Sequence, residues 1–186
     1  MAIKHWFIGD QHFYHTNIIR FCKRPYANAK EMNTDLIARH NAIVGKDDKV
    51  WHLGDVMYWK GYTDPAKYGA SKTKLLHIMQ RLNGKHELIL GNHDTFTPRD
   101  YVAVGFTAVH TSLTIDVQGN PIFLNHDPCV GSGVPKSKIF ICGHTHGLFK
   151  TVLNENKNCA PCINVSVENW EYTPVSFDQI IGELEG

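Results

Sequence analysis

Polar residues with metal-binding side chains follow five short apolar runs of this sequence. The runs end at Asp10-Gln11-His12, Asp55, Asn92-His93-Asp94, His126 and His144-Thr145-His146. Ligands of layered α/β proteins bind just beyond the carboxyl ends of strands. If each run is a strand, the five strand ends therefore deliver these side chains to one site. Imidazole, carboxylate and amide donors without cysteine favour Mn, Fe, Zn, Co or Ni over a metal that prefers thiolates.

The number of donors predicts two metal ions. Seven side chains are candidate ligands: Asp10, His12, Asp55, Asn92, His126, His144 and His146. One ion that keeps open positions would not use them all, whereas two ions about 3.5–4 Å apart that share a carboxylate would. Two divalent ions exceed the negative charge of the two aspartates, so they attract phosphate and lower the pKa of a bridging water. That chemistry is suited to in-line attack on phosphorus.

The elements that must position these residues are short strands alternating with helices, which predicts an α/β or α+β fold. Four glycines stand directly before the polar residues: Gly9, Gly54, Gly91 and Gly143. We expect them to allow the sharp turn that ends each strand. The pattern predicts strands at 3–9, 49–53, 86–90, 106–110, 112–117, 121–125, 138–142 and 163–167. It predicts helices at 15–24, 28–44, 65–82 and 176–185.

Composition restricts the class of protein. The chain has 186 residues, 42% of them hydrophobic, which predicts a single globular domain over 1–186. Its formal net charge of +1 argues against a protein that wraps long nucleic acid. No apolar run approaches the ~18 residues of a membrane span, and no signal peptide is evident, so we expect a cytoplasmic protein, in the host cytoplasm if a phage encodes it. Five irregularly spaced cysteines do not resemble a disulfide framework. Cys159 and Cys162 are expected to be reduced loop residues rather than half of a metal or redox site.

The ordered motifs resemble those of the calcineurin-like metallophosphoesterase superfamily. They are Asp10-x-His12, Gly54-Asp55, Gly91-Asn92-His93-Asp94, His126 and Gly143-His144-Thr145-His146. The resemblance covers about residues 3–180 and is strongest to a small bacterial and phage branch, through the opening IGDQHFYHTNIIRFCKRPY, the EMN at 31–33 and the ending INVSVENWEYTPVSFDQI. It implies a two-layered β-sandwich flanked by helices, with the metals at the strand ends.

The resemblance also implies a role for each residue. Asp10, His12 and His146 would hold the first metal, Asn92, His126 and His144 the second, and Asp55 would bridge them. His93 would bind no metal and would protonate the leaving group or stabilise charge, with Asp94 fixing the tautomer of its ring. The sequence departs from the family pattern at Gly9, at Asp127-Pro128 and in the short, Gly-rich stretch 129–138. That stretch is expected to line the substrate side, so the departures bear on which substrate is bound.

Several neighbouring residues have open interpretations. His15 and Asn17 either reach a substrate phosphate or form a structural turn and helix cap, and Arg20 either does the same or lies on a solvated helix face. Trp51, Tyr58 and Trp59 are expected in the core and its rim, with a base-stacking surface as the alternative. His52 is expected to pack beneath the site.

Together these features predict a binuclear phosphodiesterase that hydrolyses a small phosphodiester or a cyclic nucleotide by attack of a metal-bridging hydroxide. The chain leaves little room for a cap domain, so we expect an open site, with Mn²⁺ as the favoured metal. The alternatives are a phosphomonoesterase, a nuclease acting on nucleic-acid ends or short fragments, and a non-catalytic scaffold. The scaffold is disfavoured because His93 and a complete ligand set are present. No membrane partner is expected.

Overall fold

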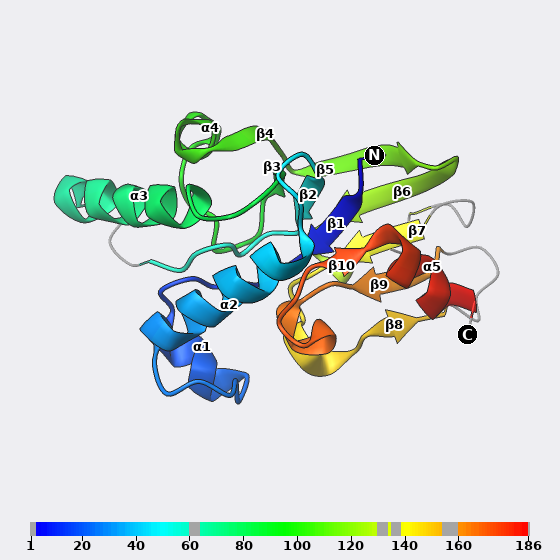
Figure 1. Ribbon diagram of the computed structural model, residues 1–186, viewed down its shortest axis with the longest axis horizontal. Helices are drawn as coiled ribbons and strands as arrows, with labels where there is room; N and C mark the ends of the chain where they lie inside the picture. The colour runs from blue at the N-terminus through cyan, green and yellow to red at the C-terminus, as the bar shows by residue number, and fades with distance from the viewer. Residues whose placement is uncertain (1–2, 60–63, 130–133, 135–138, 154–159, 186) are drawn as a thin grey trace.

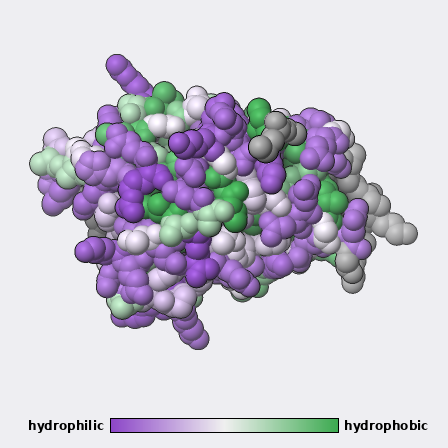
Figure 2. All heavy atoms as spheres, in the orientation of Figure 1, coloured by the Kyte–Doolittle hydropathy of each residue, from purple (hydrophilic) through white to green (hydrophobic). Residues whose placement is uncertain are grey.

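The computed structural model describes residues 3–59, 64–129, 134, 139–153 and 160–185. Within them two five-stranded sheets pack face to face, and helices cover the outer face of the first (Figure 1). This is the two-layered, helix-flanked architecture that the family resemblance implied. Polar side chains cover most of the face seen in Figure 2, and hydrophobic ones form small separate patches.

The first sheet has the strand order β10-β1-β2-β3-β4. Strands β1 (His5–Ile8), β2 (Lys49–His52), β3 (Lys85–Ile89) and β4 (Phe106–His110) are parallel, and β10 (Val175–Ser176) is antiparallel to β1. Parallel neighbours place their carboxyl ends at one edge of the sheet, which brings the residues after β1, β2 and β3 together.

The second sheet has the order β5-β6-β7-β9-β8. Its strands are β5 (Ser112–Val117), β6 (Asn120–Asn125), β7 (Ile139–Cys142), β8 (Thr151–Val152) and β9 (Cys162–Asn164). Strands β6, β7 and β9 are parallel, while β5 and β8 pair antiparallel at the two edges. The parallel pair β6–β7 directs His126 and His144 toward the same edge.

Alternation along each central strand separates two cores. In β1, Trp6 and Ile8 face the helices, whereas Phe7 lies between the sheets with Ile122 and Ile141 of the second sheet. Side chains of a strand point alternately to opposite faces, and both faces of β1 are covered, so its three buried residues, Trp6, Phe7 and Ile8, are all apolar.

Four helices pack beside the first sheet: α1 (Thr16–Phe21), α2 (Ala29–Ile43), α3 (Pro65–Met79) and α4 (Pro98–Val104); α5 (Phe177–Glu185) packs by β10 and β1. The side chain of Asn28 caps α2 by accepting from the Glu31 amide at 3.0 Å, and Asp64 caps α3, whose first residue is Pro65. None of the helices described here is both long and apolar enough to cross a bilayer.

The expected strands and helices are present, with ends that differ by a few residues. The pattern missed α4, β8, β10 and the 3-10 turns η2 (His146–Leu148) and η3 (Val167–Trp170). Helix α4 has only seven residues, too few to show a helical period, but Thr97-Pro98 is a start signal because the Thr97 hydroxyl accepts from the Asp100 amide at 3.2 Å.

Candidate metal centre

The predicted ligands meet where the carboxyl ends of β1, β2 and β3 face those of β6 and β7. Residues 134 positions apart become neighbours there: the His144 amide donates to the Asp10 carboxylate at 2.8 Å. All seven candidate ligands lie in this region, in two groups that share Asp55. The gathering follows from topology, because both sheets present parallel strand ends at the same place.

The first group contains Asp10, His12 and His146. One donor atom from each lies within 4.8 Å of the others. Asp10 and His12 are buried, and His146 is half-buried. The rings of His12 and His146 are stacked 5.2 Å apart, so their nitrogens and the Asp10 carboxylate surround a common volume.

The second group contains Asn92, His126 and His144. The Asn92 Oδ1 atom is 3.0 Å from His126 Nε2 and 2.9 Å from His144 Nδ1, and the two ring nitrogens are 3.1 Å apart. The Leu53 carbonyl can only accept, so His126 Nδ1 donates to it at 2.7 Å and leaves Nε2 with its lone pair toward the group. Neutral imidazole in this tautomer is the form that binds a metal.

Asp55 lies between the two groups. Its Oδ2 atom is 3.5 Å from His12 Nε2 and 3.8 Å from His126 Nε2. Its Oδ1 atom accepts from the His93 amide at 2.8 Å, which fixes the plane of the carboxylate. A carboxylate so placed is suited to bridging two ions.

Buried donors without partners indicate that the residues fit divalent metals. Asp10 Oδ1 and both ring nitrogens of His12 are buried and make no hydrogen bond in the described part of the chain. Leaving such atoms unpaired costs about 1–3 kcal/mol each, which metal coordination would offset. Burial lowers the pKa of His12 well below its usual value, and nearby cationic side chains lower it further, so the ring is neutral. The donors are carboxylate, amide and imidazole groups, which suit the borderline metals.

The electrostatics of His146 also favour a bound cation. Burial by itself would lower the pKa of His146, but hydrogen bonds with Cys22 and Glu168 and the charge of Asp10 raise it to about 10. The ring Nδ1 lies 3.0 Å from Glu168 Oε1. The surrounding negative charge is compensated either by a proton or by a metal ion. Glu168 orients the imidazole in both cases.

Three residues outside the five motifs support the candidate ligands: Glu168, Arg24 and Ser166. The Arg24 guanidinium is buried and donates to Glu168 Oε1 at 2.6 Å and to the Asp10 carbonyl at 2.7 Å. The Ser166 hydroxyl donates to Asp10 Oδ2 at 2.7 Å, so Oδ1 is left for a metal. A signal was present, since all three residues lie within the segments FCKRPY and INVSVENW that resemble the phage branch.

The turns that present the ligands differ from expectation. Of the four glycines before the polar residues, Gly54 has a positive φ, of 87°. The left-handed conformation is otherwise adopted by ligands themselves, at Asp10, His12, Asp55, His144 and His146, with φ between 49° and 73°. Such strain in residues with a Cβ costs about 1–3 kcal/mol each and accumulates at functional sites.

The glycines are needed mainly for space. A Cβ atom at Gly143 would lie 2.6 Å from Asp10 Oδ2 and 2.9 Å from the Leu53 carbonyl. A Cβ at Gly91 would overlap the carboxylate of Asp55, and one at Gly54 would lie 2.5 Å from His126 Nδ1. The prediction that each glycine supplies special backbone freedom was therefore wrong for Gly9, Gly91 and Gly143, none of which has a positive φ. At Gly91 and Gly143 the lack of a side chain lets the ligands approach the backbone.

The role expected for Asp94 is also corrected. Its buried carboxylate accepts from the amides of Asp55 at 2.7 Å, Gly91 at 2.9 Å and Val56 at 3.2 Å, not from the ring of His93. Burial and the charge of Asp55 raise its pKa to about 7. Asp94 therefore ties the loop after β2 to the loop after β3 and positions Asp55.

His93 stands at the mouth of the site. Its side chain is 40% exposed, and Nε2 is 4.0 Å from Asp55 Oδ2. Its ring lies 5.5 Å from that of His12 and 5.2 Å from that of Tyr58. The ring belongs to neither ligand group and faces the region above the bridging carboxylate, so its expected role at the leaving group stays a prediction.

The residues expected to contact the substrate do not all lie in the same place. His15 and Asn17 line a cavity beside the centre, and the His15 ring stacks on Tyr58 at 3.9 Å. Arg20 is exposed and lies over the Phe21 ring, away from that cavity. Trp51 is buried between the sheets, so it is not an open stacking surface, whereas Trp59 stacks on Phe96 and also lines the same cavity.

Two of the expectations concern segments near the centre that lie wholly or mostly outside the described residues. Most of the stretch 129–138 lies outside them, as does Cys159. Cys162 is buried in β9, and its Sγ is 3.4 Å from Cys142 Sγ in an apolar cluster with Phe140, apart from the ligands.

His52 is fully buried and hydrogen-bonded to Gln11 at 2.7 Å, as expected for a packing residue.

Comparison with known proteins finds relatives along nearly the whole chain. Protein MJ1445 of Methanocaldococcus jannaschii, which is uncharacterised, is 34% identical over 185 residues, 98% of this chain and 92% of its own. The Gene 66 protein of Mycobacterium phage L5 is 29% identical over 170 residues, 76% of each chain. No family model matches the sequence.

Solved structures share the fold. Protein AQ665 of Aquifex aeolicus, of unknown function, superposes with a TM-score of 0.68 at 25% identity, covering 98% of this chain and 100% of its own. The nuclease MPE of Pseudomonas putida superposes with a TM-score of 0.50 at 17% identity, covering 87% and 74%. At that identity the second likeness concerns the fold alone.

Proposed function

The chain belongs to the calcineurin-like metallophosphoesterase superfamily, in the small branch with the phage relatives, and from this membership we propose that it is a binuclear metal-dependent phosphodiesterase. The observation that carries the proposal is the position of Asp55 Oδ2, 3.5 Å from His12 and 3.8 Å from His126, between two complete donor groups. Two ions about 3.5–4 Å apart act together on a phosphoryl group, and a carboxylate between the two donor groups can be shared by both ions.

The proposed division of labour follows the two groups. Asp10, His12 and His146 hold one ion, and Asn92, His126 and His144 hold the other. When bound, the pair supplies Lewis-acid stabilisation of phosphate charge and a water of lowered pKa. Mn²⁺ is the favoured occupant, because imidazole-rich sites bind Mg²⁺ poorly.

His93 completes the proposed chemistry. Its ring is half-exposed and lies outside the ligand groups, so it can protonate the oxygen that leaves phosphorus. Asn92 and His144 are exposed as well, so a phosphate with a substituent on both sides can reach the centre. This accessibility supports a small phosphodiester or cyclic nucleotide as substrate.

The test combines metal content with turnover. Protein loaded with Mn²⁺ should contain two ions per chain by elemental analysis and hydrolyse bis(p-nitrophenyl) phosphate and at least one cyclic nucleotide. Asp55→Asn should lower the occupancy of both ions, whereas His12→Ala should affect mainly one. His77→Ala, an exposed histidine of α3, is the control and should change neither.

Three results would contradict the proposal. One ion per chain in saturated protein would overturn the binuclear centre. Monoester hydrolysis without diester hydrolysis under any metal would overturn the substrate class. Two bound ions without any turnover would favour the scaffold alternative.

A further inference from the structure

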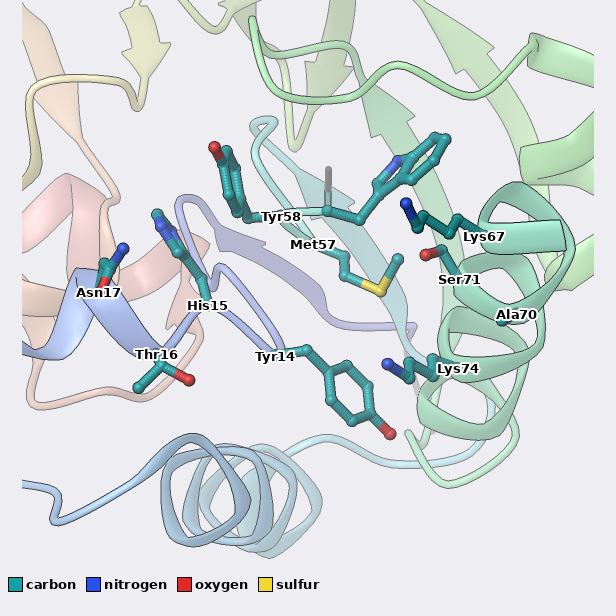
Figure 3. A pocket seen from close by; sticks show the side chains of 11 residues that line it. Tyr14, His15, Thr16, Asn17, Met57, Tyr58, Lys67, Ala70, Ser71 and Lys74 are labelled. Carbon is teal, nitrogen blue, oxygen red and sulfur yellow. The ribbon is translucent and has the colours of Figure 1, made fainter. Parts of the chain in front are cut away.

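A cavity of about 450 Å³ lies beside the metal centre. Its walls come from Tyr14–Asn17 at the start of α1, Met57–Trp59 after β2, and one face of α3 (Figure 3). Its volume falls within the range of roughly 300–1,000 Å³ that is typical of small-ligand sites. None of the seven candidate metal ligands lines it.

The cavity adjoins the side of the centre where His93 lies. The stacked rings of His15 and Tyr58 form the common wall. The ring of His15 is 5.3 Å from that of the ligand His12, and the ring of Tyr58 is 5.2 Å from that of His93. A group that leaves phosphorus next to His93 would therefore enter this cavity.

The α3 wall is cationic. Lys67 and Lys74 are seven residues apart, two helical turns or roughly 10 Å along the axis, and they share one face with Ser71 between them. Among the described residues that line the cavity there is no aspartate or glutamate. Lys67 pairs with Asp64 at 3.2 Å in an exposed setting, and such pairs are weak. Within the described residues Lys74 forms no ion pair, and its Nζ lies 5.4 Å from the Tyr14 ring.

The opposite wall is aromatic and polar. Figure 3 shows His15 and Tyr58 on the far side of the cavity from α3, with Asn17 beside them and Tyr14 below. Aromatic side chains provide faces for nucleobases, and the side-chain amide of asparagine can both donate and accept hydrogen bonds. One wall thus suits a nucleoside and the other a negatively charged group.

We propose that this cavity binds the leaving nucleoside of a nucleotide phosphodiester together with the next phosphate of the strand. The nucleoside contacts Tyr14 and Tyr58, and the second phosphate lies at Lys67 and Lys74. The inference rests on the proposed phosphodiesterase function and narrows its substrate to short single strands that carry a further phosphate. A cyclic nucleotide has no second phosphate and would leave the lysines without a partner.

The experiment compares three substrates of the Mn²⁺-loaded protein: a deoxydinucleotide with phosphates at both ends, the same dinucleotide without them, and bis(p-nitrophenyl) phosphate. The end-phosphorylated dinucleotide should have a KM about 10-fold below that of the unphosphorylated one, since a charge-assisted contact is worth about that factor. The preference should weaken as ionic strength rises, because salt screens exposed charges.

Variants locate the preference. In Lys67→Ala/Lys74→Ala the advantage of the end-phosphorylated dinucleotide should disappear, and the loss on that substrate should exceed the loss on bis(p-nitrophenyl) phosphate about 10-fold. Lys46→Ala removes an exposed lysine that precedes β2, at the opposite end of that strand from Met57–Trp59, and should retain the preference. Calorimetric binding of the end-phosphorylated dinucleotide to metal-free protein should show the same dependence on the two lysines, which separates binding from turnover.

The two proposals fail in different ways. Absence of bis(p-nitrophenyl) phosphate hydrolysis by fully loaded protein would overturn the function. Hydrolysis of that substrate without a preference for terminal phosphates, or with a preference that the double variant keeps, would overturn the role of the cavity alone.

Discussion

Local hydrogen bonds set the chemical form of two of the proposed metal ligands, His126 and Asp10. His126 keeps Nε2 for a ligand role because Nδ1 is engaged by the Leu53 carbonyl. Asp10 keeps Oδ1 because Oδ2 accepts from Ser166 and from the His144 amide. His93 has no comparable hydrogen bond from its ring in the described part of the chain, and its Nε2 is 4.0 Å from Asp55. A ring that is not held in one tautomer is suited to proton transfer.

For single residues of the site, the prediction concerns His93→Ala. Because the ring is outside both donor groups, the variant should retain metal content and melting temperature. It should lower kcat by roughly 10²–10⁴ for a substrate with an alkoxide leaving group, the usual worth of a general acid. The deficit should shrink for an aryl phenolate, which needs less protonation.

Steady-state kinetics on both leaving groups, together with elemental analysis, check this. Loss of a metal ion would make His93 a ligand. An equal deficit for phenolate and alkoxide would mean that the ring acts through charge or positioning. Asp94→Asn serves as the comparison: since the Asp94 carboxylate binds three backbone amides, that variant should alter metal affinity and stability as well as kcat.

The strand ends decide how closely these residues can approach. The loops after β1, β2, β3 and β7 bring carboxylates against neighbouring backbone, and glycines provide the space. The left-handed conformation of ligands such as Asp10 and Asp55 is maintained by the hydrogen bonds around them, including those of Asp94 to the Asp55 and Val56 amides.

In the loops at the strand ends, Gly91→Ala is predicted to weaken metal binding at the centre. The added methyl group would overlap the Asp55 carboxylate, so Asp55 must move and the shared ligand is displaced. Metal affinity should fall by at least about 10-fold, the range seen when the orientation of a ligand is lost. Calorimetric titration with Mn²⁺ measures the affinity.

Gly69→Ala is the matched control. Gly69 lies in α3 with no atom within 4 Å of an added Cβ, so the alanine should leave metal affinity unchanged. It should raise the free energy of unfolding by about 0.5–1 kcal/mol, the difference in helix propensity. Equal metal affinities for the Gly91 and Gly69 variants would contradict the role assigned to close approach.

Across the whole molecule, buried histidines connect the site to the helical layer. Gln11, between the ligands Asp10 and His12, contacts His52, and His52 Nε2 lies 3.0 Å from His86 Nδ1. His40 of α2 packs near His86 and donates from Nε2 to the Asn83 carbonyl at 2.7 Å. Burial lowers the pKa of both His40 and His86 to about 4, and that of His52 falls well below its usual value.

These shifts predict acid-labile folding. Below pH 6.5 the unfolded chain binds protons that the folded chain does not, so the free energy of unfolding decreases as pH falls from 6.5 toward 4. At pH 5 the loss should be on the order of 2 kcal/mol for each of His40 and His86. Urea titrations of metal-free protein at pH 7 and pH 5 measure it.

His40→Gln tests the assignment, since glutamine can still donate to the Asn83 carbonyl but does not titrate. This variant should lose less stability between pH 7 and pH 5 than the parent protein. His77→Gln, at an exposed position of α3, should lose as much as the parent. An unchanged pH dependence in the His40 variant would show that this histidine is not buried neutral in the folded state.

The sequence by itself predicted the seven candidate donors, their order, the superfamily, and the strands and helices other than α4, β8 and β10, because apolar runs followed by polar residues are local patterns. Only the tertiary structure revealed Glu168 and Ser166, which lie more than 140 residues from the Arg24 and Asp10 groups that they contact. It also reversed two expectations, the turn-forming role of Gly91 and Gly143 and the partner of Asp94. Whether a side chain has space, and which donor it contacts, depends on how the two sheets pack. The spacing of residues along the sequence carries no information about distances between the sheets.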